Sequence, residues 1–482
     1  MKSYITKPKS IKIRTNYSLS ARDYRVLSSK NKNVKILKDI IISEFQWKEI
    51  WSDGYLGQSK YRFLKTGNIW KSSFLLDTGN IEYCFPVNQK HPKDGDILIA
   101  KDGGWDGLWD VILYKKSLEY IDTISAGIHC ITPEHKNRYY IFWLLKTQFF
   151  KNFVDLNTAW WSIIRHAKKI ALDFPLPFPT IKNHPHPEQV EEYISLLVQN
   201  MIDKEEQIKA KNEEIDRLIE NELRENQKGN IFRYAYPRIW EIREETRFDT
   251  WIYEKEFKRI SNLIDNYTDG KFYLDENKIA PGVTPKDYYF SDSKKNHNFY
   301  DWVTPKNIDQ RQLAFHTYIF TKTKSKIKNN SLILNGIRYV GNGIFVEKGS
   351  CIYANQNTLI INQFDDKLKQ LFLFCFLTSN LGKKLQLLRR NFWIVPILYT
   401  EHLCKISIPD FPDSKQQEIA KLYYNPIPNN ADLTLETYLK WEKIRNSEVG
   451  IFQLNMEIFE LREILEETID RIVMEETIEI IL

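Results

Sequence analysis

Residues 187–228 read PEQVEEYISLLVQNMIDKEEQIKAKNEEIDRLIENELRENQK, and this stretch sets the architecture of the 482-residue chain. Its apolar side chains recur at the two alternating positions of a heptad repeat, which is typical of a helix with one narrow apolar stripe. The stripe consists of Ile194, Leu197, Met201, Ile208, Ile215 and Leu218, and it is interrupted by Lys204 and Lys211. Glu188 favours a helix start and Gly229 a helix end. The pattern predicts a helix of about 35–40 residues, roughly 50–60 Å long.

A second stretch with the same pattern lies in residues 448–482, preceded by Gly450. Its apolar residues are Ile451, Leu454, Ile458, Leu461, Leu465 and Ile472. A lone helix with one narrow apolar stripe is marginal in water and needs a partner. The simplest partner is the other helix, so we expect an antiparallel coiled coil that joins two globular parts.

The charge of the chain is unevenly distributed. The formal net charge is +6, but residues 187–228 hold 6 Lys and Arg against 12 Asp and Glu, and residues 448–482 hold 2 against 10. Without these two stretches, at −6 and −8, the remaining chain carries +20. This distribution is typical of a protein that binds a polyanion and keeps its acidic segments for another partner. The alternative is that the acidic stretches are solvated helix faces and the positive surplus is diffuse.

The composition excludes several classes of protein. Hydrophobic residues make up 42% and aromatic residues 14% of the chain, enough to bury more than one core. The longest apolar runs, Tyr139–Leu145 and Leu371–Leu377, are far shorter than the roughly 18 residues that cross a bilayer. The N-terminal residues have no apolar signal region, and no two of the five cysteines have CxxC spacing. We therefore expect a cytoplasmic protein without a membrane partner, a disulfide framework or a metal site.

The chain also contains an internal repeat, because five blocks of its first half recur in order in its second half. Residues 66–69, 95–99, 144–147, 176–179 and 212 align with 305–308, 330–334, 376–379, 408–412 and 455. Short β-rich runs, one apolar helix and a Pro-rich exit in each half predict mixed α and β structure. The last offset implies an insertion of about 15 residues around Pro426–Val449.

Several of these blocks resemble a known family. Residues 282–285 (GVTP) and 301–308 (DWVTPKNI) resemble the "GGTP … WVTPKDI" opening of a target recognition domain in type I restriction–modification specificity (S) subunits. Residues 95–103 (GDILIAKDG) are similar to "GDILISRDG" of that family, and 61–69 (YRFLKTGNI) to its "RxGDI" form. Residues 176–179 with 187–189 are similar to its "LPxPPLxEQ" lead into a conserved helix, whereas the second such lead is degenerate.

The resemblance implies an α+β fold of two tandem pseudo-repeated α/β target recognition domains, joined by two long helices in an antiparallel coiled coil. The implied boundaries are 1–184 for the first recognition domain, 185–228 for the central spacer helix, 229–412 for the second recognition domain and 413–482 for the C-terminal region with its insertion. Each recognition domain would read one half of a bipartite, gapped DNA target, and the coiled coil would set the spacer between them.

The resemblance also implies the partners. These are double-stranded DNA, two methyltransferase (M) subunits and restriction/translocase (R) subunits of a phage-defence complex. S-adenosylmethionine, ATP and Mg would be bound by the partner subunits and no cofactor by this chain. The alternatives are a non-catalytic protein scaffold and a degenerate specificity protein of another anti-phage system.

The residues offer no catalytic machinery, so we expect no enzymatic activity of the chain by itself. There is no phosphate-binding G-x-x-x-x-G-K-[ST] loop, no methyltransferase NPPY or DPPY tetrapeptide, no HExxH and no GxSxG. Asp94, Asp96 and Lys101 lack the E-x-K ending of a nuclease set, and Asp96 more simply caps a turn before a strand. His184 and His186 lie beside prolines, a pattern more typical of a surface loop than of a metal site.

Candidate DNA contacts are cationic and amide side chains near aromatic residues or in Gly-containing loops. They are Lys65, Lys101, Trp105, Arg165, His166, Lys168, Lys169, Lys306, Asn307, Gln310, Arg311, Arg338, Lys383, Lys384, Arg389 and Arg390. The alternative for each is that the aromatic residues are core and the cations solvated. Candidate subunit-docking residues, from the resemblance, are Pro187, Glu188, Gln189, Gln416 and Gln417.

Overall fold

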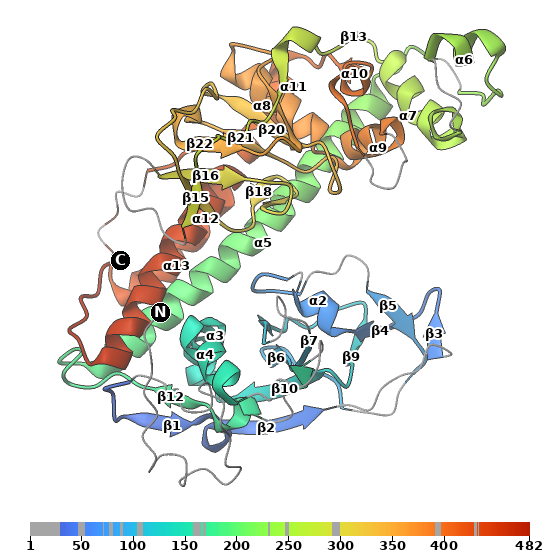
Figure 1. Ribbon diagram of the computed structural model, residues 1–482. Coiled ribbons are helices and arrows are strands. Elements are labelled where there is room, and N and C mark those ends of the chain that lie inside the picture. Colours follow the sequence, from blue (N-terminus) through green and yellow to red (C-terminus); the bar gives the residue numbers. More distant parts are fainter. Residues whose placement is uncertain are drawn as a thin grey trace. The chain divides into compact units, whose positions relative to one another are not determined.

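The heptad stretch forms one continuous helix, α5 (Pro187–Glu225), of 39 residues, in agreement with the prediction (Figure 1). The computed structural model describes residues 29–46, 54–70, 72–76, 81–86, 90–103, 109–157, 165–166, 170–229, 232–245, 250–291, 299–390, 397–428, 431 and 433–482. The chain divides into two units. The first unit comprises residues 1–205, 430–444 and 458–482, and the second comprises 206–429 and 445–457.

The first unit is built on two four-stranded sheets. One sheet has the antiparallel order β2 (Ile41–Gln46), β10 (Ile128–Pro133), β6 (Ile97–Ala100) and β8 (Val111–Leu113). The other has the order β3 (Tyr55–Leu56), β5 (Glu82–Cys84), β4 (Tyr61–Leu64) and β9 (Ile121–Ile124), and its β4 and β9 are parallel. Asp96 caps the turn before β6, as predicted, because its carboxylate accepts the backbone N–H of Lys93 at 2.7 Å.

Shorter elements complete the first unit. The helices are α2 (Thr66–Trp70), α3 (Arg138–Lys146) and α4 (Gln148–Asn157), and the 3-10 turns are η2 (Leu37–Asp39), η4 (His135–Asn137) and η5 (Ile170–Asp173). Two antiparallel ladders join β1 (Val34–Ile36) to β12 (Pro175–Pro177) and β7 (Asp102–Gly103) to β11 (Arg165–His166). Apolar side chains from both sheets meet in one core that includes Leu64, Leu98, Ile112, Ile124 and Ile128.

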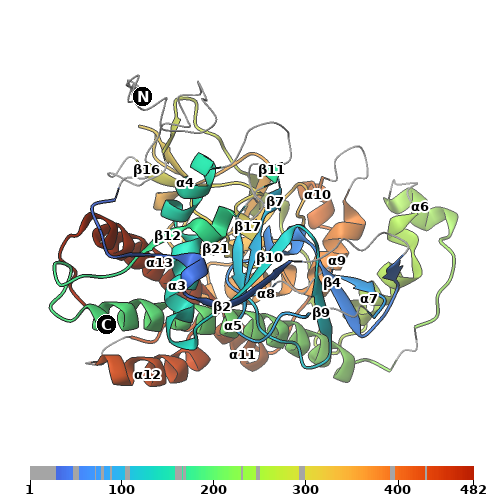
Figure 2. The same cartoon turned by 90° about the horizontal axis from the view of Figure 1, so that it is seen from below.

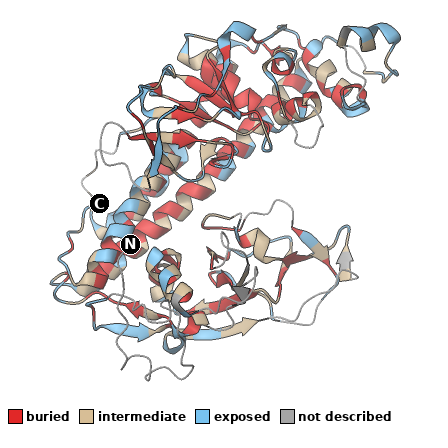
Figure 3. Cartoon of the chain, viewed as in Figure 1, coloured by how far each residue is buried: buried red, intermediate tan, exposed pale blue. Residues whose placement is uncertain are grey.

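The second unit repeats the strand order of both four-stranded sheets. Its antiparallel sheet has the order β14 (Ile279–Pro281), β23 (Thr358–Ile361), β20 (Ser331–Asn335) and β21 (Gly343–Val346). Its mixed sheet has the order β15 (Tyr289–Ser291), β19 (Tyr318–Phe320), β16 (Phe299–Val303) and β22 (Ile352–Ala354), again with the last pair parallel. The ladder of β13 (Lys271–Phe272) with β24 (Ile408–Pro409) matches that of β1 with β12. Buried residues are concentrated in the sheets and along α5 (Figure 3).

The remaining elements of the second unit are helices and short strands. They are α6 (Ile239–Glu245), η6 (Trp251–Tyr253), α7 (Lys255–Asp265), η7 (Glu276–Lys278), β17 (Ile308–Asp309), β18 (Gln312–Leu313), η8 (Gly349–Cys351), α8 (Lys367–Leu377), α9 (Asn380–Arg389) and α10 (Thr400–Leu403).

The internal repeat predicted from the sequence is confirmed, and it includes an equivalent turn in each unit that an asparagine side chain stabilises. In the first unit the side-chain oxygen of Asn68 accepts the backbone N–H of Lys65 at 2.8 Å. In the second unit the side-chain oxygen of Asn307 accepts the backbone N–H of Thr304 at 3.1 Å. The two turns follow the equivalent strands β4 and β16, so the aligned blocks TGNI and PKNI occupy the same place in both units.

The second heptad stretch also forms a helix, as predicted: α13 (Ile451–Met474), of 24 residues. Two further helices, α11 (Asp413–Tyr423) and α12 (Leu435–Glu448), precede it. The backbone N–H of Gly450 donates to Asn425 at 3.1 Å, and a Cβ at position 450 would lie 2.4 Å from the Asn425 nitrogen. Glycine is needed for this approach, which lets α13 begin beside the end of α11. We call residues 424–450 the α12 excursion; they include the predicted insertion.

Helices α11 and α13 run antiparallel to α5. In the second unit Lys415, at the start of α11, lies 3.9 Å from Glu222 near the end of α5. In the first unit Asn183, just before α5, donates to the backbone of Arg471 near the end of α13 at 3.1 Å. The predicted antiparallel arrangement is therefore present, with the α12 excursion inserted between its two segments.

Helix α12 lies along α5 (Figure 2) and explains the two lysines that interrupt the heptad stripe. The Lys204 ammonium lies 2.8 Å from the Glu442 carboxylate of α12, and both side chains are buried. Lys211 donates to the backbone oxygen of Ser447 at 2.6 Å. Both lysines are thus partnered by the additional helix.

Among the residues that the structure describes, none of the helices combines the length and the apolarity needed to cross a bilayer.

Candidate nucleic-acid interface

Each unit presents a connection between the last two strands of its antiparallel sheet. In the second unit this connection, residues 336–342, joins β20 to β21 and exposes Arg338 and Tyr339. Its backbone is sharply turned, with φ of 62° at Arg338 and 91° at Gly341. In the first unit the equivalent connection, residues 101–110, joins β6 to β8. The second-unit connection therefore places a cationic and an aromatic side chain in an exposed turn, the type of segment that reaches into a DNA groove. Residues 104–108 of the first-unit connection lie outside the described residues.

The first-unit connection is joined to a second predicted segment. In the β7–β11 ladder Arg165 pairs with Gly103 and His166 pairs with Asp102 through the backbone. The structure thereby brings together two of the three segments that combine cations with aromatic residues in the sequence. The side chains of Arg165 and His166, together with Trp105, Lys168 and Lys169, lie outside the described residues.

The second-unit connection is likewise joined to predicted residues. Gly343 donates to the backbone oxygen of Gln310 at 2.9 Å, and Gln310 itself is exposed with φ of 48°. A Cβ at Gly341 would lie 2.5 Å from the side chain of Lys383, so this lysine packs against the turn. Burial, together with repulsion from Arg311, lowers the pKa of Lys383 to about 8. Gln310, Arg338 and Lys383 therefore belong to one surface.

Arg311 and Asn307 require a correction, because both side chains are buried in internal contacts. The Arg311 guanidinium donates to Asp216 and to the side chain of Asn212, each at 2.7 Å, and to Thr378 at 3.0 Å. Asn307 holds the turn described above. Arg311 anchors α5 to α8 and Asn307 shapes the chain after β16, so neither is free to contact DNA.

Other predicted cations already have partners within the chain. Lys65 pairs with Glu82 at 2.6 Å, Lys384 with Glu256 at 2.9 Å and Arg389 with Glu245 at 2.6 Å. Lys101 donates to Gln46 at 2.8 Å. Lys306 is exposed, and burial lowers the pKa of the half-buried Arg390.

Four lysines that were not among the predicted DNA contacts follow β19 in the chain. Lys322, Lys324, Lys326 and Lys328 are all exposed, and Ser325 and Ile327 between them are half-buried. In the described part of the chain no carboxylate forms an ion pair with any of the four. None of residues 322–328 belongs to a helix or strand, and Thr323, between Lys322 and Lys324, is exposed as well. We call the four lysine side chains the lysine row. The signal in the sequence is the alternation KTKSKIK.

Aromatic residues lie on the strands next to the lysine row. Tyr289 of β15 stacks on Phe320 of β19 with ring centroids 4.7 Å apart, and Tyr289 and Phe290 are both exposed. β19 leads directly into the lysine row, so exposed aromatic rings and unpaired cations border the same sheet. Such a surface suits the phosphate backbone and the sugar edges of nucleic acid.

The predicted docking residues lie at the starts of α5 and α11. Pro187 begins α5, Glu188 is exposed and Gln189 is half-buried. Gln417 is exposed, whereas Gln416 is buried and donates to the backbone of Phe411 at 2.7 Å. Gln416 therefore stabilises the entry into α11 and is not available to a partner.

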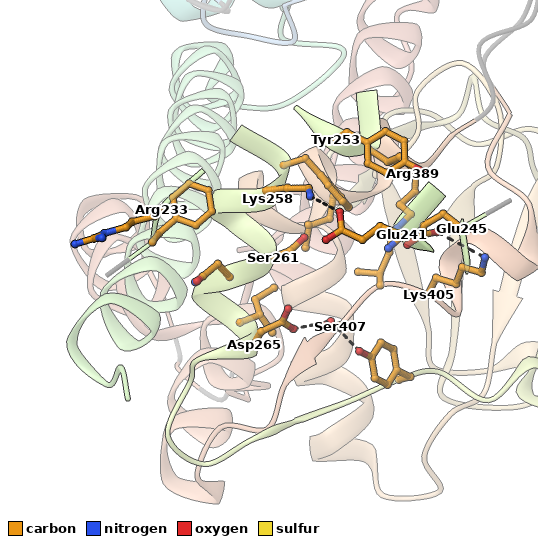
Figure 4. A pocket seen from close by; sticks show the side chains of 18 of the residues that line it. Arg233, Glu241, Glu245, Tyr253, Lys258, Ser261, Asp265, Arg389, Lys405 and Ser407 are labelled. Carbon is orange, nitrogen blue, oxygen red and sulfur yellow. Dashed lines mark hydrogen bonds and ion pairs between the residues drawn. The ribbon is translucent and has the colours of Figure 1, made fainter. Parts of the chain in front are cut away.

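Within the described residues there is no group of three or more His, Cys, Asp or Glu side chains arranged to hold a metal ion. A cavity of about 530 Å³ in the second unit is lined by residues of α6, α7 and α9, among others (Figure 4). Of the residues predicted to contact DNA, Arg389 lines it.

No family model and no curated protein matches the chain. The crystal structure of the type I restriction–modification S subunit of M. genitalium is 9% identical, covers 92% of this chain and 98% of that chain, and superposes with a TM-score of 0.37. A chain from a structure on complex assembly and conformational transition of the type I R-M system is 12% identical, covers 93% and 98%, and has a TM-score of 0.28. The HsdS subunit from Thermoanaerobacter tengcongensis is 12% identical, covers 91% and 96%, and has a TM-score of 0.24. These are remote similarities to the family that the sequence motifs resemble.

Proposed function

We propose that this chain is the DNA sequence-specificity subunit of a type I restriction–modification complex. The observation that carries the proposal is the duplication: two units with the same strand order, each continuous with one part of α5. A protein that reads two separated half-sites needs two readers and a rigid connection between them. In this proposal each unit reads one half of a gapped target, and the antiparallel helices set the spacer.

The charge distribution supports DNA as the ligand. The chain outside the two acidic stretches carries +20, and the second unit exposes the lysine row and Arg338. Lysine and arginine side chains neutralise phosphates. The exposed Arg338 of the β20–β21 connection and the exposed Gln310 between β17 and β18 are of the side-chain types that read base edges in the major groove.

In this proposal the chain is not an enzyme, and chemistry is supplied by its partners. Two methyltransferase subunits would dock on the acidic helices near Glu188 and Gln417, and restriction/translocase subunits would join them. S-adenosylmethionine, ATP and Mg would be bound by those partners. The alternative of a plain protein scaffold predicts no sequence-selective DNA binding.

A footprint on duplex DNA tests the proposal. The full chain, co-expressed with a methyltransferase encoded beside its gene, should protect two short blocks separated by an unprotected spacer, with an affinity that falls steeply as salt rises. Absence of any sequence-selective protection would favour the scaffold. A bipartite footprint without methylation would instead favour a degenerate specificity protein of another anti-phage system.

A single substitution can separate the two readers. Arg338→Ala should relax recognition in one half-site by about 1–3 kcal/mol if Arg338 contacts a base, and leave the other half-site unchanged. Lys116→Gln, at an exposed lysine of the first unit, is the matched control and should change neither half-site. Equal weakening of both half-sites by Arg338→Ala would contradict one reader per unit.

A further inference from the structure

In the second unit, the candidate DNA surface is joined to α5 by a residue at its border. Gln310 is exposed, whereas the next residue, Arg311, is only 3% exposed. The Arg311 guanidinium donates to the carboxylate of Asp216 and to the side-chain oxygen of Asn212, each at 2.7 Å. These hydrogen bonds connect the chain between β17 and β18 directly to α5. We call Arg311, Asp216 and Asn212 the α5 latch.

Further hydrogen bonds connect the α5 latch to the helices around it. The Asp216 carboxylate also accepts the backbone N–H of Asn380, at the start of α9, at 3.2 Å. The Arg311 guanidinium donates to Thr378, which follows α8, at 3.0 Å. The Tyr423 hydroxyl of α11 donates to the backbone oxygen of Arg311 at 3.2 Å. The latch therefore ties the strands of the second unit to α5 and α11 together.

The chemistry of the latch fixes an orientation as well as a contact. A guanidinium is planar and donates its hydrogen bonds in fixed directions. Asn212 and Asp216 are four residues apart, and side chains at this spacing lie on the same side of a helix, one turn from each other. Because Arg311 is buried and charged, breaking these bonds leaves a guanidinium with neither water nor its carboxylate, which is strongly unfavourable.

The latch is continuous with the residues proposed to read DNA. Gln310 directly precedes Arg311 in the chain. Gly343, which directly follows the connection that carries Arg338, donates its backbone N–H to the oxygen of Gln310 at 2.9 Å. A displacement of Arg311 relative to α5 would therefore also displace Gln310 and the connection with Arg338.

The first unit is attached to α5 at the equivalent place by different residues. After the turn that Asn68 stabilises, the backbone N–H of Phe74 donates to the Glu205 carboxylate of α5 at 2.9 Å. Arg462 of α13 donates to the Ser73 hydroxyl at 2.7 Å and lies over the buried Phe74 ring, 4.7 Å from its centroid. In both units, the chain that leaves the asparagine-stabilised turn is thus bonded to a carboxylate of α5.

From this geometry we propose that Arg311 is a positioning residue for DNA recognition. Together with Asp216 and Asn212 it fixes the orientation of the second unit's reader on α5, and thereby the spacing between half-sites that the chain accepts. This inference rests on the proposed function. One base pair shifts a half-site by about 3.4 Å along the duplex and by about one tenth of a turn around it. A reader of fixed orientation therefore meets its bases at one spacing, whereas a reader released from the latch meets them at several.

The first measurement is the dependence of DNA affinity on spacing. The full chain, co-expressed with a methyltransferase encoded beside its gene, is titrated with duplexes that carry the two footprinted blocks at the native spacing and at spacings one base pair shorter and longer. The wild-type chain should prefer the native spacing at least about tenfold, because a misplaced half-site loses its base contacts. Arg311→Met should bind the three spacings nearly equally. Its affinity for a duplex with only the half-site that Arg338→Ala relaxes should stay unchanged.

Two further variants separate positioning from stability. Asp216→Asn keeps the shape of the side chain and should weaken the spacing preference in the same direction as Arg311→Met. Gln370→Leu is the matched control, because Gln370 is fully buried and its side chain donates to the backbone oxygen of Ile361 at 2.9 Å and accepts the N–H of Phe364 at 3.0 Å. It removes buried hydrogen bonds inside the reader and should leave the spacing preference unchanged.

The second measurement needs no DNA. Spin labels on the native Cys351, which is exposed in η8, and on Glu213→Cys, at an exposed position of α5, report the distance between reader and helix by pulsed electron paramagnetic resonance. The background carries Cys404→Ser, because Cys404 is half-buried. The wild-type latch and Gln370→Leu should give one narrow distance distribution, and Arg311→Met a broader one.

Three results would overturn the proposal: an equally narrow distance distribution in Arg311→Met, a spacing preference that survives this substitution, or an equal loss of the preference in Gln370→Leu. A wild-type chain that protects no two-block target would refute the proposed function and with it the role in spacing. That result is distinct from a two-block target whose spacing preference does not depend on Arg311.

Discussion

Replacing Glu442 by Met should detach α12 from α5. The Lys204 ammonium and the Glu442 carboxylate are 2.8 Å apart, with only 1% and 4% of their side chains exposed. Asn200 donates to the same carboxylate at 2.9 Å and to the Tyr438 hydroxyl at 2.7 Å. Glu442→Met leaves the buried ammonium without this carboxylate, which costs about 3–5 kcal/mol.

The double variant Lys204→Met with Glu442→Met should behave differently. Replacing both members of a buried ion pair by apolar groups of similar volume is often neutral or stabilising by about 1–4 kcal/mol, because the desolvation penalty of both charges disappears. We therefore expect the double variant to hold α12 at least nearly as well as the wild-type chain, and the single variant to hold it far less well.

Hydrogen exchange of the backbone amides in residues 435–448 measures this directly, since a chain of two units need not unfold in one step. A loss of about 3–5 kcal/mol corresponds to exchange faster by roughly two to three and a half powers of ten. Lys38→Met, which breaks an exposed pair with Asp173, is the control and should change local stability by less than about 1 kcal/mol. Equal exchange in the single and double variants would show that the Lys204–Glu442 pair does not hold α12 on α5.

Three further predictions concern charge. Changing all four residues of the lysine row to Gln should lower the slope of log affinity against log salt for duplex DNA by up to about 3.6, and an unchanged slope would exclude contact with phosphates. Burial lowers the pKa of Lys146 to about 7. The unfolded chain therefore binds more protons than the folded chain between about pH 7 and pH 10, and the free energy of unfolding should rise with pH in that range. Lys146→Met should flatten this rise in thermal melting curves, although it also removes the donor to the backbone oxygens of Ser73 and Val111. Lys383, with a pKa of about 8, should lose its charge as pH rises from about 7 to 9, and DNA affinity should fall with it in the wild-type chain but not in Lys383→Met.

Much of the fold could be predicted because its signals are periodic. The heptad stripe placed α5 within a few residues of its observed end, and the aligned blocks located equivalent strands and turns in both units. The α12 excursion could not be recognised in the same way, since α12 has no apolar stripe and instead buries Glu442, Asn446 and Tyr438. Lys204 and Lys211 were the visible signal, because lysines in a heptad stripe require partners from a further element.

The candidate interface was harder to predict, because it depends on contacts between distant residues. The neighbouring sequence does not distinguish Arg311, which is buried against Asp216, from Arg338, which is exposed. The β7–β11 ladder likewise joins segments far apart in the chain. The lysine row was readable as an alternation of lysines, but a search for cations interleaved with aromatic residues passes over it.

In the proposed function, two repeated units read two halves of one target. We would test this by sequencing adenine methylation in host DNA after co-expression of this chain with a methyltransferase encoded beside its gene. Methylation should occur at a gapped, two-part motif, and Arg338→Ala should alter the motif on one side of the gap alone. A single continuous motif, or methylation that does not depend on the presence of this chain, would show that the two units do not read two half-sites.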